Sequence, residues 1–72
     1  MVQVKFAIRK INVQAHGYVQ YLCKHEDGVY FSYADYPTDV FYFDRKDDAV
    51  DYIKHRKLNY CEIIEVYINE KE

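Results

Sequence analysis

The sequence predicts an α+β domain of 72 residues, in which one helix packs on one face of a small antiparallel or mixed sheet. The elements follow the order β-β-β-α-β. Residues 45–57 have the charge and apolar pattern of one amphipathic helix, and the segments on either side alternate between apolar and polar residues as strands do. An Asp27-Gly28 turn joins two of these segments. We expect one domain, 1–72, which buries only about 60% of the surface of its unfolded form.

The first expected strand begins at the N-terminus, where residues 2–8 carry apolar side chains at every even position. The alternation changes phase near Lys10, which a bulge or a bend would explain. A turn at 14–17 follows, and Gly17 can adopt a positive φ there.

The second and third expected strands cover residues 18–25 and 29–34, which alternate on either side of Glu26-Asp27-Gly28. An Asp-Gly pair between two such stretches favours a tight hairpin. We therefore expect these two strands to pair antiparallel.

The expected helix begins after Asp44, whose carboxylate can cap the free N–H groups of the first turn. Acidic residues follow at its positive end and basic residues at its negative end, as the helix dipole favours. The narrow apolar stripe consists of Ala49, Val50 and Ile53, with Tyr52 at its edge. The stripe must pack on a sheet, because helices of about 12–15 residues are marginal in water alone.

Two further segments flank the helix. Pro37 excludes a central strand at 35–39. Residues 40–43 run apolar into the helix, and they either add a short edge pairing or staple the helix entry. The last expected strand is 60–68, before a polar tail. Its two faces carry Ile64, Val66 and Ile68, and Cys61, Ile63 and Tyr67.

One helix covers at most one face of the sheet. The other face keeps several large side chains whichever way each strand is turned, from the set Tyr18, Leu22, Tyr30, Cys61, Ile63 and Tyr67. An uncovered apolar face of that size usually marks an interaction surface. A homo-oligomer, most simply a two-fold dimer, would bury it.

Composition and charge argue against some functions. The net charge of −2 disfavours sequence-independent binding to nucleic acid, which needs a basic face. The chain begins with a strand-like pattern, and it has neither a signal-peptide pattern nor an apolar run of about eighteen residues. We therefore expect a soluble, cytoplasmic protein that does not enter the membrane.

No catalytic, cofactor or metal site emerges from the sequence. The soft metal-ligand candidates are His16, His25, His55, Cys23 and Cys61. They form no C-x-x-C pair and no pair of histidines at helical spacing. A Cys–His pair would need an oxyanion hole and a third residue to orient the histidine, and neither is evident. We expect packing cysteines, turn and surface histidines, and no enzymatic activity.

The segment 33–42 is the candidate binding site, because this loop is richer in aromatic and acidic residues than packing alone requires. Tyrosine offers a large contact area at a low cost in rotamer entropy. The candidate binding residues are Tyr33, Asp35, Tyr36, Asp39, Phe41 and Tyr42, with the sheet tyrosines Tyr18 and Tyr30. The alternative is that Tyr36 and Phe41 simply pin this loop to the sheet.

Two other uses of the tyrosines stay open. Aromatic side chains on a sheet can stack on the bases of single-stranded nucleic acid. An oligomer could equally cage a nucleotide, with tyrosines on the base and Arg9, Lys10 or Lys24 on the phosphate.

Residues 43–66 form a pattern of a capped helix followed by a strand. It runs from Phe43-Asp44-Arg45-Lys46-Asp47-Asp48-Ala49-Val50-Asp51-Tyr52-Ile53 through Leu58-Asn59-Tyr60 to Glu62-Ile63-Ile64-Glu65-Val66. This pattern resembles the tail of many small proteins encoded by bacteriophages of Gram-positive hosts. The resemblance implies an accessory protein, and a number of these disarm bacterial immunity by binding a host protein or by sequestering a nucleotide signal. We expect a non-enzymatic protein that binds and inhibits a bacterial host protein, such as a component of a CRISPR or nucleotide-signalling defence. A nucleotide sponge and a nucleic-acid-binding module are the alternatives.

Overall fold

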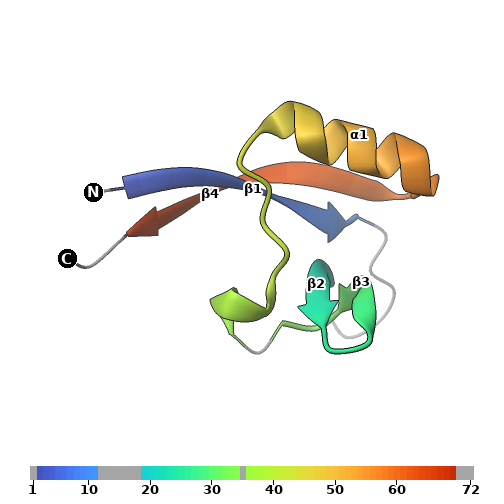
Figure 1. The fold of residues 1–72 in the computed structure, drawn as a ribbon, viewed down its shortest axis with the longest axis horizontal. Helices are drawn as coiled ribbons and strands as arrows, with labels where there is room; N and C mark the ends of the chain where they lie inside the picture. Colours follow the sequence, from blue (N-terminus) through green and yellow to red (C-terminus); the bar gives the residue numbers. More distant parts are fainter. Residues whose placement is uncertain (1, 12–18, 35, 70–72) are drawn as a thin grey trace.

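A computed structural model describes residues 2–11, 19–34 and 36–69, and over these residues the fold is α+β. One four-stranded antiparallel sheet has the order β3-β2-β1-β4, and one helix, α1, lies on one of its faces (Figure 1). The elements are β1 Val2–Lys10, β2 Tyr21–His25, β3 Gly28–Ser32, a 3₁₀ turn η1 Pro37–Asp39, α1 Lys46–Arg56 and β4 Cys61–Asn69. The predicted class and element order are confirmed.

The strands β1 and β4 form the longest ladder of the sheet. Their register runs without interruption from Val2 opposite Asn69 to Lys10 opposite Cys61. The phase change near Lys10 is therefore a bend at Ile11 and not a bulge, and the Ile11 N–H donates to the carbonyl of Tyr60 at 2.9 Å. The predicted turn at 14–17 lies outside the described residues.

The strands β2 and β3 form the predicted hairpin. His25 pairs with Gly28, so that Glu26 and Asp27 alone make the connection. Gly28 has a φ of 146°, a conformation that side chains with a Cβ rarely adopt. The hairpin is confirmed, and its strands are shorter than the sequence suggests because β2 begins at Tyr21 and β3 ends at Ser32.

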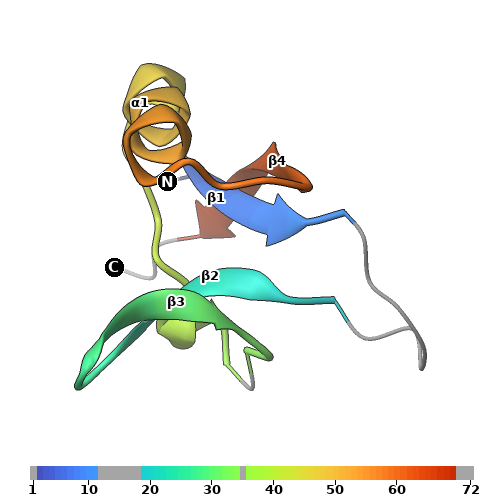
Figure 2. The same cartoon turned by 90° about the vertical axis from the view of Figure 1, so that its right-hand side faces the viewer.

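The strands β1 and β2 pair at a single position, Arg9 opposite Tyr21, and then diverge. Residues 40–43, which we call the inserted segment, lie between them. Phe43 exchanges two backbone hydrogen bonds with Phe6 of β1, and the Phe41 N–H donates to Leu22 of β2 at 2.9 Å. Figure 2 shows this connection descending from α1 past β1 to β2. The segment does pair with strands, as one of the two expectations had it. It pairs with two strands inside the sheet, however, and not at an edge.

The core lies between the sheet and α1. It is built on Ile8, Leu22, Phe43 and Ala49, and partly buried side chains pack around these four. The helix contributes Ala49, Tyr52 and Ile53. Tyr52, which was expected at the edge of the stripe, is partly buried against this core, and its ring meets that of Phe43 edge-on at 5.5 Å between centroids.

The start of α1 differs from the prediction. The N-cap residue is Arg45, which makes no side-chain capping bond, and α1 spans 46–56 where 45–57 was expected. Asp44 instead forms an ion pair with Lys5. The physical reason is that Phe43 is fixed against Phe6, so that the next residue of the segment lies beside Lys5 of β1. The expected charges at the two helix ends are confirmed.

Candidate functional site

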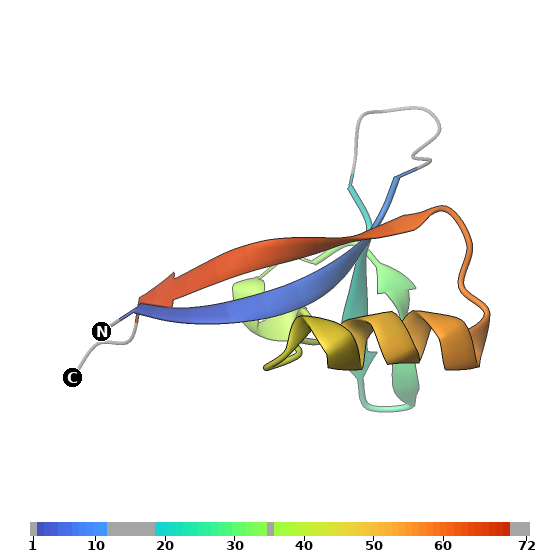
Figure 3. The same cartoon turned by 90° about the horizontal axis from the view of Figure 1, so that it is seen from above.

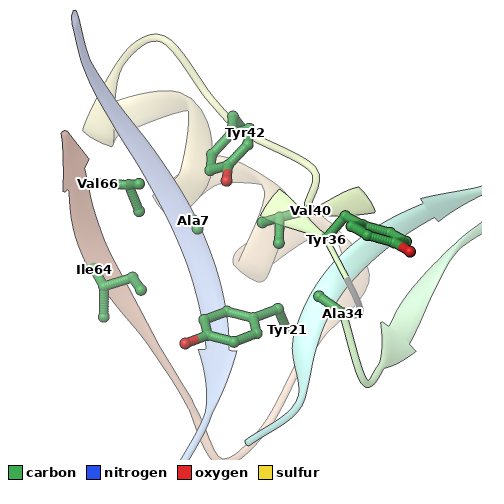
Figure 4. Close-up of a pocket in the computed structure, with 8 residues that line it drawn as sticks. All are labelled: Ala7, Tyr21, Ala34, Tyr36, Val40, Tyr42, Ile64 and Val66. Carbon is green, nitrogen blue, oxygen red and sulfur yellow. The ribbon is translucent and has the colours of Figure 1, made fainter. Parts of the chain in front are cut away.

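The face of the sheet away from α1 carries a hollow of about 300 Å³, which we call the tyrosine hollow (Figure 4). Ala7, Ile64 and Val66 from β1 and β4 form one side of it. Three tyrosines, Tyr21, Tyr36 and Tyr42, surround it, and Ala34 and Val40 complete the lining. Apart from the tyrosine hydroxyls, all of these side chains are apolar.

The strand register explains why these side chains meet. Ala7 lies opposite Ile64, and residues paired in this way point to the same face. The Phe6–Phe43 bridge places the neighbouring pair, Ala7 and Tyr42, on that face as well. Because the side chain of Ala7 is only a methyl group, the larger groups around it leave a space.

The tyrosines differ in direction. Figure 4 shows the hydroxyl of Tyr42 pointing into the hollow, the ring of Tyr21 extending toward Ile64, and the hydroxyl of Tyr36 pointing away. Burial raises the pKa of Tyr42 above its ordinary value, and the nearby Tyr21 and Cys23 add to this effect. Tyr42 therefore stays a neutral hydroxyl at physiological pH.

Two ion pairs flank the hollow along β1. Lys5 and Arg9 lie two residues before and after Ala7 on the same face, because side chains alternate along a strand. Lys5 pairs with Asp44, and the Nε of Arg9 donates to the Oε1 of Glu62 at 2.8 Å. This bond to Glu62 raises the pKa of Arg9 further, so the guanidinium keeps its charge.

The turn η1 holds Tyr36 at the edge of the hollow. The N–H of Tyr36 donates to the Oδ2 of Asp39 at 3.2 Å, and the N–H of Asp39 donates to the carbonyl of Tyr36 at 3.0 Å. The carboxylate of Asp39 thus stabilises the conformation of the loop. Tyr36 remains 68% exposed, so pinning to the sheet does not account for it.

The other predicted binding residues are dispersed. Phe41 is partly buried against the core, where it stacks on Phe43 at 4.9 Å between ring centroids, so the pinning alternative describes this residue. Tyr33 is exposed, and Tyr30 stacks on His25 at 3.9 Å, with its hydroxyl donating to Asp27 at 3.2 Å. Asp35 and Tyr18 lie outside the described residues.

The prediction of an uncovered face is partly corrected. Leu22, Cys61 and Ile63 were candidates for it, but they pack in or against the core beneath α1. Tyr67 pairs with Val4, on the α1 side of the sheet, and is 65% exposed. The strand register decides which side chains of a strand lie on which face of the sheet, and the alternation of residues alone does not determine that register.

Sequence reasoning missed most of the lining. Tyr21, Ala7 and Val66 were not singled out, because each is unremarkable within its own strand. The available signal was the small Ala7 on the face opposite Phe6 and Ile8, together with the apolar side of the last strand. These clues converge only when the strand order is known.

The remaining polar groups of the described residues include two cysteines and the pair Ser32 and His25. The thiol of Cys23 is fully buried and donates to the carbonyls of Tyr21 and Ser32, at 3.3 and 3.8 Å. Burial raises the pKa of the Cys61 thiol, which disfavours the nucleophilic thiolate. The Oγ of Ser32 lies 3.0 Å from the Nε2 of His25. Among the described residues, no group of three or more His, Cys, Asp or Glu side chains could hold a metal ion.

The cations proposed for a phosphate do not converge either. The ammonium of Lys10 lies over the ring of Phe31, at 5.3 Å from its centroid, and Phe31 packs on the core beneath α1. Lys24 shares that side with Leu22, whereas Arg9 lies on the hollow side. No helix among the described residues has the length and apolar character to cross a membrane.

Comparisons of this chain with protein-family models, with curated proteins and with solved structures find no match.

Proposed function

We propose that this chain is a non-enzymatic binding protein whose tyrosine hollow receives apolar side chains of a partner protein. The observation that carries the proposal is the hollow of about 300 Å³, lined by apolar groups and three tyrosines. That volume is at the lower limit of small-molecule sites, which range over about 300–1,000 Å³. It suits a large aromatic side chain, and buried aromatic anchors in well-packed pockets dominate the energy of many interfaces.

The surroundings of the hollow also support the hypothesis that it binds a partner protein. Protein interfaces combine an apolar centre with a polar rim, and tyrosine is enriched in them. Here the centre is Ala7, Ile64 and Val66, and the ion pairs of Lys5 and Arg9 flank it on both sides. The hydroxyl of Tyr42 points inward and adds one polar group to this apolar lining.

The partner that we propose is a bacterial host protein, which the chain would inhibit by covering part of its surface. The resemblance of residues 43–66 to small bacteriophage proteins supports this choice, and a defence component is the most direct candidate. The divergence of Arg9, Lys10 and Lys24 gives no support to a nucleotide cage within one copy of the chain.

The test is capture from a bacterial lysate by the immobilised chain, with quantitative mass spectrometry, followed by an affinity measurement on the purified partner. Tyr21→Ala and Tyr36→Ala remove two sides of the hollow. Tyr60→Asn is the matched control, because Tyr60 is 68% exposed, does not line the hollow and has a φ of 56°, which Asn tolerates.

We expect a partner that the wild-type chain and Tyr60→Asn bind equally. Truncation of hot-spot residues costs 2 kcal/mol or more, so each hollow variant should weaken binding by about thirtyfold. Circular dichroism verifies that the variants fold. A captured protein that binds both hollow variants as tightly as the wild type would contradict the proposal.

A further inference from the structure

The outer edge of β4 presents backbone groups that no described residue pairs with. Phe6 directs its N–H and C=O toward Phe43, so the even-numbered residues of β1 face the inserted segment and the odd-numbered ones face β4. Their partners on β4 are Glu62, Ile64, Val66 and Ile68. The alternate residues therefore direct their N–H and C=O groups away from the sheet: Cys61, Ile63, Glu65, Tyr67 and Asn69.

This edge has few of the features that usually protect an edge strand. Native proteins block exposed edges with short strands, charged side chains (above all Lys), Pro or bulges. The strand β4 is nine residues long, contains neither Pro nor Lys, and pairs with β1 without a bulge; its charged residues are Glu62, which is bonded to Arg9, and Glu65. The opposite edge, β3, has five residues. Figure 3 shows that β1 and β4 extend beyond α1 toward the chain ends, so the helix does not cover this part of the ladder.

We propose that a second copy of this chain pairs antiparallel with β4 along this edge, with Val66 on the two-fold axis. In this register Val66 lies opposite its own copy, Ile64 lies opposite the second copy's Ile68, and Glu65 lies opposite the second copy's Tyr67. Apolar side chains then meet on the hollow side. On the α1 side, each carboxylate meets a phenol, and the Tyr67 hydroxyl already donates to Glu65 at 2.9 Å within one chain.

Charge and polarity select this register from its neighbours. A two-fold axis at Glu65 would place that carboxylate directly opposite its own copy, and like charges in that position destabilise a sheet. An axis at Ile64 would place the carboxylate of Glu62 opposite the apolar side chain of Val66. Of these three axes, only the one at Val66 places Ile64, Val66 and Ile68 of one copy directly opposite the same three residues of the other.

The pairing has a consequence for the tyrosine hollow. Because Ile64 and Val66 line it, the two-fold axis brings the hollows of both copies together on the same face of a continuous sheet. The dimer would present one wide apolar surface with a hollow on each side. The dimer does not depend on the proposed function, since a single copy already contains a complete hollow.

The test is a scan of single cysteines in a Cys61→Ser background, where the remaining Cys23 is fully buried. Residues opposite each other at a non-hydrogen-bonded position lie about 4.5 Å apart between Cα atoms, which permits a disulfide. We expect Val66→Cys to form a covalent dimer on mild oxidation, about tenfold faster than Ile64→Cys or Glu65→Cys. Faster cross-linking at Ile64 or Glu65 would overturn the proposal.

Analytical ultracentrifugation of the unmodified chain provides a second readout. We expect twice the mass of one chain, and a monomer at about millimolar concentration would overturn the proposal. Tyr67→Pro removes an outward N–H that bonds to no described residue of its own copy, and should weaken self-association by about tenfold or more. Tyr67→Ala keeps the N–H and serves as the matched control. Equal association of the proline and alanine variants would contradict backbone pairing, whatever the outcome of the lysate capture.

Discussion

Phe6 and Phe43 exchange two backbone hydrogen bonds, with N–O distances of 2.8 and 2.7 Å, and this pair connects the core to the candidate site. The bonds fix the inserted segment between β1 and β2. Successive side chains of a strand point to opposite faces. Phe43 therefore enters the core beneath α1, and Tyr42 enters the tyrosine hollow on the other side.

The substitution Phe43→Ala should lower the free energy of unfolding by about 3–5 kcal/mol, because it leaves a cavity among Ile8, Leu22 and Ala49. Small domains are marginally stable, so this loss approaches the total. Urea denaturation measures it. Val4→Ala is the control, since Val4 is 44% exposed, and it should cost about 1 kcal/mol or less. A loss for Phe43→Ala as small as that of the control would contradict the role of Phe43 in the core.

Replacement of Lys57 by Gly should stabilise the domain by about 0.5–1 kcal/mol. Lys57 ends α1 with a φ of 53°, and its N–H donates to the last turn of the helix, an arrangement in which glycine avoids the Cβ penalty. Lys54→Gly is the matched control, because it places glycine inside α1 and should destabilise by about 1 kcal/mol. Thermal unfolding compares the two, and stability lost in both would be inconsistent with the left-handed C-cap.

Alkaline pH should destabilise the fold through Tyr42. Burial raises the pKa of Tyr42 in the folded state above its ordinary value of 10.0, so the folded state holds this proton more tightly than the unfolded state. The resulting stabilisation of the folded state is fully present below pH 10.0, and it is lost as the pH rises through the pKa of Tyr42 in the folded state. Denaturation as a function of pH should show a shallower alkaline loss for Tyr42→Phe than for the wild type. The Tyr36→Phe variant is the reference for the removal of a tyrosine from the loop, and an identical pH profile for Tyr42→Phe and the wild type would contradict the burial of that hydroxyl.

Local signals in the sequence were sufficient for the elements of the fold. The Asp27-Gly28 pair identified the hairpin, and the charges around Asp47 and Lys54 identified α1. Both signals act between neighbours in the chain, so they can be read without knowing the tertiary structure. The prediction that Asp44 caps α1 was wrong, because its carboxylate forms an ion pair with Lys5 of β1, which is distant in the sequence.

The tyrosine hollow could not be predicted in the same way. Its lining comes from β1, β2, β4 and the segment 34–42, and only the strand order brings these together. The apolar run at 40–43 carried one unused clue, since a run without alternation is typical of a strand covered on both faces. Tyr36 and Tyr42 were found because they stand in the aromatic loop. Tyr21 was not, because it alternates with its neighbours as any strand residue does.

Amide hydrogen exchange at Phe41 and Phe43 tests the central claim most directly, because both N–H groups are bonded to strands inside the sheet. Native-state exchange followed by NMR should show protection close to that of the β1–β4 ladder, since such groups open only when the sheet unfolds. Tyr60, a residue that is 68% exposed and whose N–H makes no backbone hydrogen bond to a described residue, provides the reference for rapid exchange. Protection at Phe41 and Phe43 near that of the β1–β4 ladder is the result that the insertion predicts. Exchange as fast as that of Tyr60 would contradict both the insertion and the hollow built upon it.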